Sequence, residues 1–170
     1  IAGLYALPKR GTYLTTPFTF AATSHAIIIA GSKVKFCDID ENTLNIDPEL
    51  IENLIDDDTI GVVGTHVYGN PCDVDSIHEI CKMYSLYEVY DAAHFVDVSY
   101  KGVSLYKYGL FSVASFHATK LLHCCEGGAL FTSSRNLAQR IKIFMNFGIE
   151  NEERISCVGL NGKMSEINAA

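Results

Sequence analysis

With 170 residues, the chain has the length of one domain and is long enough to bury one sizeable core. Hydrophobic residues make up 48% of the chain and charged residues only 19%, which predicts a buried sheet and a surface that meets a partner. The net charge of -7, without any cluster of Lys or Arg, argues against nucleic acid and anionic membranes as partners.

The predicted elements alternate between strands and helices along the chain. In chain order they are strand 12–17, helix 20–31, strand 33–40, helix 45–55, strand 60–69, helix 73–85, strands 86–94, 111–117 and 127–133, and helix 136–148. Gly31 and Gly148 end the helices that precede them, and the first of these helices is apolar enough to be buried. Asp47 is the expected N-cap of another helix, with Pro48 in its first position.

Strands that are apolar on both faces and separated by helices indicate an α/β domain with a mostly parallel sheet. In such sheets, ligands bind at the carboxyl ends of the strands. The polar residues in the last part of a predicted strand segment or just after it are therefore the first candidates for chemistry, namely His66, Asp91, His94, Ser115 and Lys120.

The remaining composition describes the setting of the chain. The longest nearly apolar run, "HAIIIAG", is far shorter than the roughly 20 residues of a spanning helix, and no signal-peptide order is present, so we expect a cytoplasmic protein. The six cysteines form no CxxC pair and are interpreted as buried or half-buried free thiols. The chain begins without Met and ends on "SEINAA", which is typical of mid-helix, so we expect a piece of a longer protein.

Asp91 and Lys120 together indicate a chemistry that neither indicates alone. Asp91 is either a cap or loop acceptor, or the anchor of a cationic ligand atom. Lys120 by itself more often extends to solvent, but a sheltered lysine loses its charge easily and attacks aldehydes. Pyridoxal 5'-phosphate uses both residue types, because its C4' carbon bonds a lysine and its ring nitrogen needs a carboxylate.

Neighbouring residues supply the other groups that this cofactor needs. Ser115 and Thr119 carry hydroxyls for part of a phosphate site, and Phe20 is a candidate for the flat apolar face beside the ring. His66 is open between a substrate-side role and a structural one. The "HCCE" segment, His123 to Glu126, lacks the spacing of a metal site, and we expect no metal.

Several motifs occur in the order that is found in one enzyme family. They are "PFTFAATSHA", "VKFCDIDENTLNIDP", "THVYGNPCDVDSI", "YDAAH", "SFHATK" with "EGGALFT", and "NFG" followed by "GLNGKMSEINAA". Over essentially its whole length, the chain resembles the DegT/StrS family of sugar-nucleotide aminotransferases. The forms "SFHATK" and "VYDAAH" resemble most the branch that aminates C4 of dTDP-4-keto-6-deoxyglucose.

The resemblance implies a fold and a set of roles. The fold is the large domain of a PLP-dependent transferase of fold type I (aspartate aminotransferase-like), spanning residues 1–170, without the N-terminal segment and the C-terminal small domain. Lys120 matches the Schiff-base lysine, Asp91 the pyridinium partner and Ser115 a phosphate ligand. Phe20 matches the ring-stacking aromatic and His94 the contact to the cofactor's 3'-oxygen, although a histidine in a loop is otherwise often bonded to backbone.

Asn161 resembles the asparagine that reaches the cofactor phosphate of the neighbouring subunit, which implies a homodimer with shared active sites. The chain departs from the family after "DAAH", where Phe95 and Asp97 are expected near the cofactor edge. Leu110 stands where relatives often carry Asp.

The implied activity is transfer of an amino group from glutamate to the 4-keto group of a nucleotide-linked 4-keto-6-deoxy sugar, for surface polysaccharide or glycoconjugate synthesis. Two alternatives are amination at C3 of a 3-keto sugar nucleotide and a non-catalytic fragment of the same fold.

Overall fold

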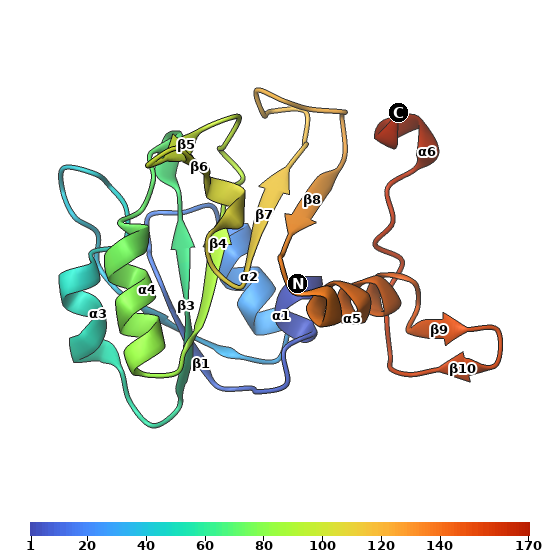
Figure 1. The fold of residues 1–170 in the computed structure, drawn as a ribbon, viewed down its shortest axis with the longest axis horizontal. Helices are drawn as coiled ribbons and strands as arrows, with labels where there is room; N and C mark the ends of the chain where they lie inside the picture. Colours follow the sequence, from blue (N-terminus) through green and yellow to red (C-terminus); the bar gives the residue numbers. More distant parts are fainter.

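The computed structural model describes all residues from 1 to 170, and a six-stranded sheet forms its centre (Figure 1). The strand order is β2-β1-β3-β4-β7-β8. These strands are β1 (Thr12–Thr15), β2 (Lys33–Phe36), β3 (Thr59–Thr65), β4 (Tyr87–Asp91), β7 (Phe111–Ser115) and β8 (Gly128–Phe131). Every pairing is parallel except that of β8, which runs antiparallel to β7. The predicted α/β class with a mostly parallel sheet is confirmed.

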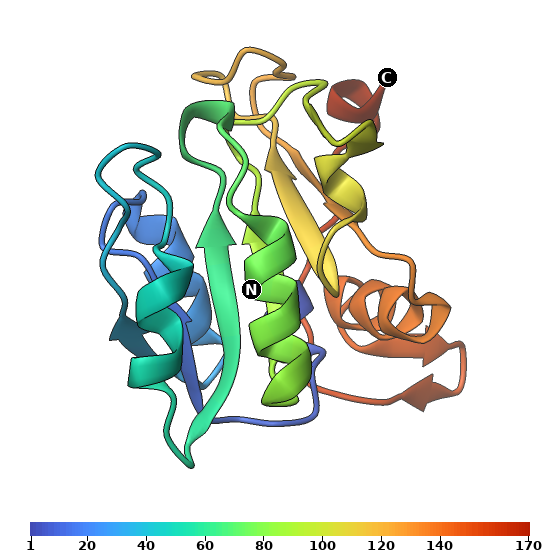
Figure 2. The same cartoon turned by 60° about the vertical axis from the view of Figure 1, so that its left-hand side comes forward.

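Helices cover both faces of this sheet. They are α1 (Ala2–Tyr5), α2 (Ala21–Ile29), α3 (Pro48–Leu54), α4 (Val74–Met83) and α5 (Arg135–Met145). A sixth helix, α6 (Glu166–Ala169), lies apart from the strands and contacts the loop between β7 and β8. Figure 2 shows α3 and α4 in front of the strands and α2 behind them. No helix is both long and apolar enough to cross a membrane.

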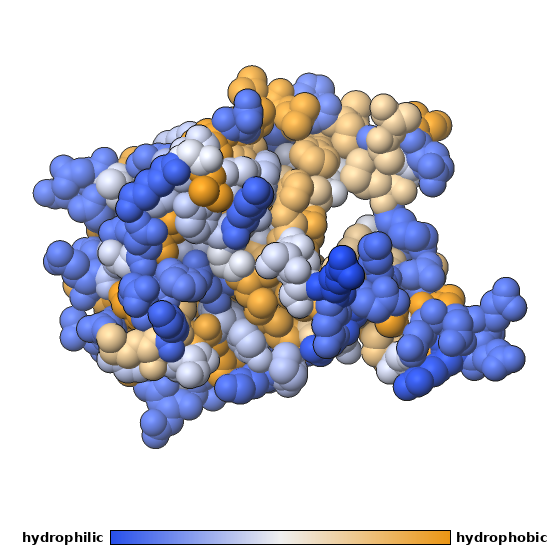
Figure 3. Space-filling model, in the orientation of Figure 1, coloured by the Kyte–Doolittle hydropathy of each residue, from blue (hydrophilic) through white to orange (hydrophobic).

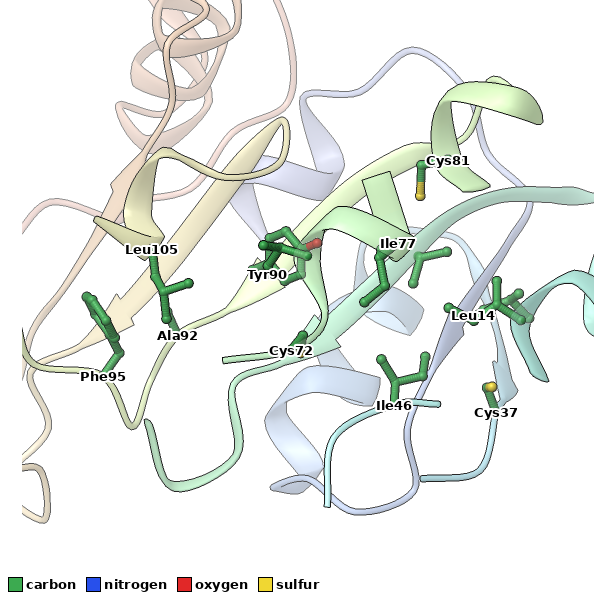
Figure 4. Close-up of a cluster of buried hydrophobic side chains, with 13 residues drawn as sticks. Leu14, Cys37, Ile46, Cys72, Ile77, Cys81, Tyr90, Ala92, Phe95 and Leu105 are labelled. Carbon is green, nitrogen blue, oxygen red and sulfur yellow. The ribbon is translucent and has the colours of Figure 1, made fainter. Parts of the chain in front are cut away.

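The two faces of the sheet carry separate hydrophobic clusters because successive strand residues point to opposite sides. In β4, Val89 joins the cluster with α1, α2 and α5, and Tyr90 joins the cluster with α3 and α4. Figure 4 shows the second cluster, in which Tyr90, Ile77 of α4 and Leu14 of β1 lie in a row across the sheet. This double burial explains why the strands are apolar on both faces.

Local signals in the sequence account for several helix ends. The Asp47 side chain accepts a hydrogen bond from the Glu49 N–H at 2.9 Å, and Pro48 is the first residue of α3, as predicted. Gly148 lies just beyond the end of α5 with φ +76°, and its N–H donates to the carbonyl of Ile143 in the last turn of that helix. A Cβ at Gly148 would lie 1.8 Å from the Cys157 carbonyl oxygen, so only glycine fits there.

Two expectations about the first half of the chain were wrong. The helix at 20–31 was expected to be buried, but Ile28 and Ile29 are 57% and 63% exposed. A helix on the surface of a sheet buries only one stripe, here Thr23 and Ile27, whatever the polarity of its other side. The strand expected at 60–69 ends at Thr65 and is followed by a 3₁₀ turn, Val67–Gly69.

The expected thiols are mostly sheltered. Cys37, Cys72 and Cys81 are buried and Cys124 and Cys157 are partly buried, whereas Cys125 is exposed, contrary to expectation. Cys125 lies at φ +68° in the loop between β7 and β8, where its side chain has no core to enter.

The shortest elements escaped prediction. They are α1, the hairpin β5 (Ser99–Tyr100) with β6 (Val103–Ser104), the 3₁₀ turn Leu105–Lys107, and the hairpin β9 (Ile149–Asn151) with β10 (Arg154–Ile155). Elements this short are below the length at which hydrophobic periodicity can be recognised.

Candidate functional site

A cavity of about 370 Å³ opens at the carboxyl edge of the sheet. Its walls come from the turn after β3, the loop after β4, the end of β7 and the loop that joins β7 to β8. The polar and aromatic residues that line it include Tyr68, His94, Phe95, Ser115, Thr119 and Lys120. Three of the candidate residues, His94, Ser115 and Lys120, therefore lie around one hollow, although they are separated by up to 26 positions in the chain.

Asp91 lies beside this cavity rather than in its wall. It is the last residue of β4, and both of its carboxylate oxygens are held: the Thr23 hydroxyl donates to Oδ2 at 2.7 Å, and the Ala93 N–H donates to Oδ1 at 3.0 Å. The Thr23 hydroxyl in turn lies 2.8 Å from the hydroxyl of Thr19, which accepts from Thr65 at 3.1 Å. The carboxylate is thus fixed at the end of a chain of hydroxyl groups.

Thr23 was not identified from the sequence. A threonine within an apolar helix has no pattern that marks it, but Thr23 lies one turn after Phe20, on the side of α2 that faces the sheet. Such a buried hydroxyl needs a partner. A search for polar residues on the inner face of predicted helices would have found it.

The backbone N–H of Tyr68 determines the tautomer of His94. The Tyr68 N–H donates to His94 Nδ1 at 3.3 Å, and the two rings are stacked with centroids 5.7 Å apart. Because Nδ1 is an acceptor, the neutral imidazole carries its proton on Nε2. Burial and the positive charge of Lys120 lower the pKa of His94, while Asp91 opposes this effect. His94 is therefore a neutral N–H donor at neutral pH.

The backbone of Tyr68 is unusual for a tyrosine. Its φ of +53° lies in the left-handed region, which costs energy for a side chain of this size. This conformation accompanies the turn that aims its N–H at His94. Sequence reasoning missed Tyr68, and "VYGN" gives only the glycine after it as a turn signal.

Lys120 is half-buried in the loop between β7 and β8. The loop is closed at its base by the Phe116 N–H, which donates to Gly127 O at 2.8 Å. Beyond Lys120, the side chains of Leu121 and Leu122 are 90% and 55% exposed, and Figure 3 shows apolar surface at the top of the molecule, where this loop lies in Figure 1. Lys120 therefore lies at the rim of the cavity, next to exposed apolar side chains.

Ser115 ends β7 with its hydroxyl available. Its Oγ accepts the His117 N–H at 3.3 Å, so its own O–H is free to donate to a ligand. Phe95, expected near the cofactor edge, does line the cavity and is only 4% exposed, whereas Asp97 does not line it. Leu110 precedes β7 at the opposite edge of the sheet.

Two candidates lie apart from the cavity. Phe20 is the N-cap of α2 with 76% of its side chain exposed, and it does not line the hollow. Asn161 is exposed and forms an isolated bridge with Asn146 near the end of α5. Within this one chain the structure does not bring either residue to Lys120.

His66 lies in the core and does not line the cavity. It is fully buried, its Nδ1 accepts the Cys72 N–H at 3.1 Å, and its ring is stacked on Tyr90 with centroids 4.8 Å apart. Burial lowers the pKa of His66 to about 4. No three His, Cys, Asp or Glu side chains in residues 1–170 are grouped as metal ligands would be.

The model of the DegT/DnrJ/EryC1/StrS aminotransferase family matches residues 4–170. The dTDP-4-amino-4,6-dideoxy-D-glucose transaminase of Shigella dysenteriae is 44% identical over 170 residues, covering 100% of this chain and 46% of the relative. The Escherichia coli transaminase of the same name is 39% identical and is also covered to 46%. The chain therefore spans about half the length of these curated relatives.

Solved structures agree with this match. DesI, solved in the presence of its TDP-sugar product, superimposes with a TM-score of 0.93 at 36% identity, over 99% of this chain and 43% of DesI. NtdA from Bacillus subtilis, solved with bound cofactor PMP, superimposes with a TM-score of 0.91 at 28% identity, over 99% of this chain and 39% of NtdA.

Proposed function

The chain belongs to the DegT/DnrJ/EryC1/StrS aminotransferase family, and from this premise we propose that the whole protein is a pyridoxal-phosphate-dependent sugar-nucleotide transaminase. It moves an amino group from glutamate to the 4-keto group of a nucleotide-linked 4-keto-6-deoxy sugar, for surface polysaccharide or glycoconjugate synthesis. The observation that carries the chemistry is the meeting of Lys120, His94 and Ser115 around one cavity, next to the fixed carboxylate of Asp91. The choice of sugar rests on the names of the relatives.

The residues present fit pyridoxal phosphate. Lys120 offers the amine for its aldehyde carbon, Asp91 the anion for its ring nitrogen and Ser115 a free O–H for its phosphate. His94 offers a neutral Nε2–H, which suits an oxygen acceptor such as the 3'-oxygen. When bound, the cofactor supplies an electron sink for the carbanion that amino transfer requires.

Each residue then has a defined task. In each half of the reaction the neutral Lys120 amine would act as general base and acid, taking a proton at Nζ from one of the two carbons that flank the transferred nitrogen and giving it to the other. Asp91 keeps the ring nitrogen protonated, and its two hydrogen bonds prevent the carboxylate from rotating away. The buried ring of Phe95 forms one side of the cavity and keeps water from that side, which strengthens these charge interactions.

Further parts of the proposal rest on the resemblance alone. Phe20 stacking on the ring, and Asn161 reaching the phosphate site of a second subunit in a homodimer with shared active sites, both stay predictions. So does a cytoplasmic location. The exposed positions of Phe20 and Asn161 leave both side chains accessible to a partner subunit.

The first test is labelling of the full-length protein with pyridoxal phosphate, followed by borohydride reduction and peptide mapping. We expect absorbance of a lysine-bound cofactor and a reduced adduct on Lys120. Lys120→Ala should abolish both, whereas Lys142→Ala, which removes an exposed lysine of α5, should leave both unchanged. A cofactor adduct that persists in Lys120→Ala would contradict the assignment.

The second test supplies glutamate and, in separate reactions, dTDP-4-keto-6-deoxyglucose and a 3-keto sugar nucleotide to the protein that is loaded with pyridoxal phosphate but not treated with borohydride, and locates the new amino group by NMR. A 4-amino product supports the proposal. A 3-amino product from a 3-keto substrate would replace it with amination at C3, and absence of any amino transfer despite a Lys120 adduct would indicate a non-catalytic use of the fold.

A further inference from the structure

His117 lies in the turn that leads to Lys120 and contacts its neighbours on both sides. Its N–H donates to Ser115 Oγ at 3.3 Å, and its carbonyl accepts the Lys120 N–H at 2.9 Å. Its Nδ1 accepts the Thr119 N–H at 3.3 Å and lies 2.9 Å from the Thr119 hydroxyl. One residue thus bonds to three residues of the segment that forms the cavity wall.

These contacts define the protonation of the ring. Because Nδ1 accepts the Thr119 N–H, it also accepts the Thr119 O–H, and the ring proton of the neutral imidazole sits on Nε2. Nε2 lies 3.6 Å from the carboxylate of Glu126, in the part of the loop that returns to β8. The Thr119 hydroxyl therefore donates to His117 rather than to a ligand, and Ser115 carries the free hydroxyl of this loop.

The returning side of the loop is itself anchored. The Asn168 side-chain amide, in α6, donates to Glu126 O at 2.7 Å and to Cys124 O at 2.9 Å. The backbone of Glu126 is consequently anchored on the side of the loop where its carboxylate can reach His117. His117 and Glu126 are both largely solvent-exposed, so their charge interaction alone contributes little to stability.

We propose that His117 is a positioning residue that fixes the turn carrying Thr119 and Lys120, and that Glu126 orients its imidazole. This inference rests on the proposed function, because it concerns the lysine assigned to the cofactor. Without the imidazole, the Thr119 N–H loses its intramolecular acceptor and the turn before Lys120 gains conformational freedom. Small displacements of a reacting group cost large factors in rate, so the effect appears in the reactivity of Lys120 rather than in global stability.

Three variants distinguish the contact at Nδ1 of His117 from the contact at Nε2. His117→Ala removes every side-chain contact. His117→Asn places an amide oxygen near the position of Nδ1 and so keeps an acceptor for Thr119, while losing Nε2. His123→Ala is the matched control, since His123 is an exposed histidine of the same loop without a hydrogen bond in the structure.

The measurement is the rate at which pyridoxal phosphate forms a borohydride-reducible adduct on Lys120 of the full-length apo protein. We expect His117→Ala to slow the rate about fivefold to tenfold, the factor that corresponds to one net hydrogen bond. His117→Asn should recover the rate to within about twofold of the unaltered protein, and His123→Ala should match it. Melting temperatures of the variants should agree with that of the unaltered protein.

Two results would overturn the inference. An unchanged rate of adduct formation at Lys120 in His117→Ala would refute the positioning role while leaving the proposed function intact. In the unaltered protein, ¹⁵N NMR that found the ring proton on Nδ1 would refute the hydrogen-bond arrangement, independently of whether His117→Ala folds. Absence of any Lys120 adduct in the unaltered protein would instead remove the proposed function, and the inference with it.

Discussion

His66 makes the stability of this fold depend on pH. Its imidazole is fully buried against Tyr90, and its Nδ1 is occupied by the N–H of Cys72, while Nε2 has no hydrogen-bond partner. Protonation of the folded state would break the bond to Cys72 and bury a charge without a counter-ion. Desolvation of the charged imidazolium by burial lowers the pKa of His66 from 6.5 to about 4.

The direction in which the free energy of unfolding changes with pH follows from the protons that the folded and unfolded chains bind. Between pH 6.5 and pH 4 the unfolded chain binds a proton at this residue and the folded chain does not, so the free energy of unfolding falls as the pH falls through this window. Above pH 6.5 the contribution of His66 is constant. The gap between 6.5 and about 4, at about 1.4 kcal/mol per pH unit, corresponds to about 3 kcal/mol lost between pH 7 and pH 4.

The assay is urea unfolding of the full-length protein at pH 7, 6, 5 and 4, compared with His66→Asn. Asparagine keeps an acceptor near the Cys72 N–H but does not titrate, so the variant should lose about 3 kcal/mol less over this range. Comparing the two proteins cancels the contribution of the carboxylates, which also titrate in acid. Parallel curves of unfolding free energy against pH would refute the reasoning.

Three further predictions concern the core, the thiols and the site. Leu14→Ala should lower the free energy of unfolding, measured with urea, by about 2–5 kcal/mol, because Leu14 is fully buried. Leu121→Ala, at a residue that is 90% exposed, should change it by less than about 0.5 kcal/mol, and equal effects of the two substitutions would contradict the placement of the core. Burial raises the pKa of Cys37 to about 11 and of Cys81 to about 12, so iodoacetamide at pH 8 should label the exposed Cys125 first. Mass spectrometry of the labelled native protein measures this order, and early labelling of Cys81 would contradict its burial. Lys120→Ala should raise the pKa of His94 toward 6.5 in an NMR titration, because the cation that lowers it is removed, and an unchanged pKa would place Lys120 away from His94.

The fold was predictable where neighbouring residues determine it. Val62 and Val63 enter opposite hydrophobic clusters, and such apolar pairs in sequence indicate a sheet covered on both faces. Asp47 and Pro48 begin a helix through contacts within a few residues. The exposure of Ile28 was not predictable in this way, since it depends on which elements pack against α2.

In the candidate site, too, the features that local sequence determines were predictable and those that depend on tertiary contacts were not. Ser115 lies near the end of a predicted strand and Lys120 follows it, and topology alone brings both to the carboxyl edge of the sheet. The bond between Thr23 and Asp91 joins residues 68 positions apart, and no local pattern reports it. The left-handed backbone of Tyr68 likewise results from the tertiary arrangement around His94. Phe20 and Asn161 remain assigned by resemblance.

Helix α2 connects two of the proposed contacts to a bound ring. Phe20 caps its first turn, and Thr23 holds Asp91 from the same turn. The two residues are three positions apart, or about 4.5 Å along the axis, and belong to one rigid element. Any sliding or rotation of α2 therefore moves the aromatic ring and the carboxylate's hydrogen-bond donor in concert. The packing of Thr23 and Ile27 against the sheet therefore sets the position of Phe20 and of the donor to Asp91 together, as a single unit.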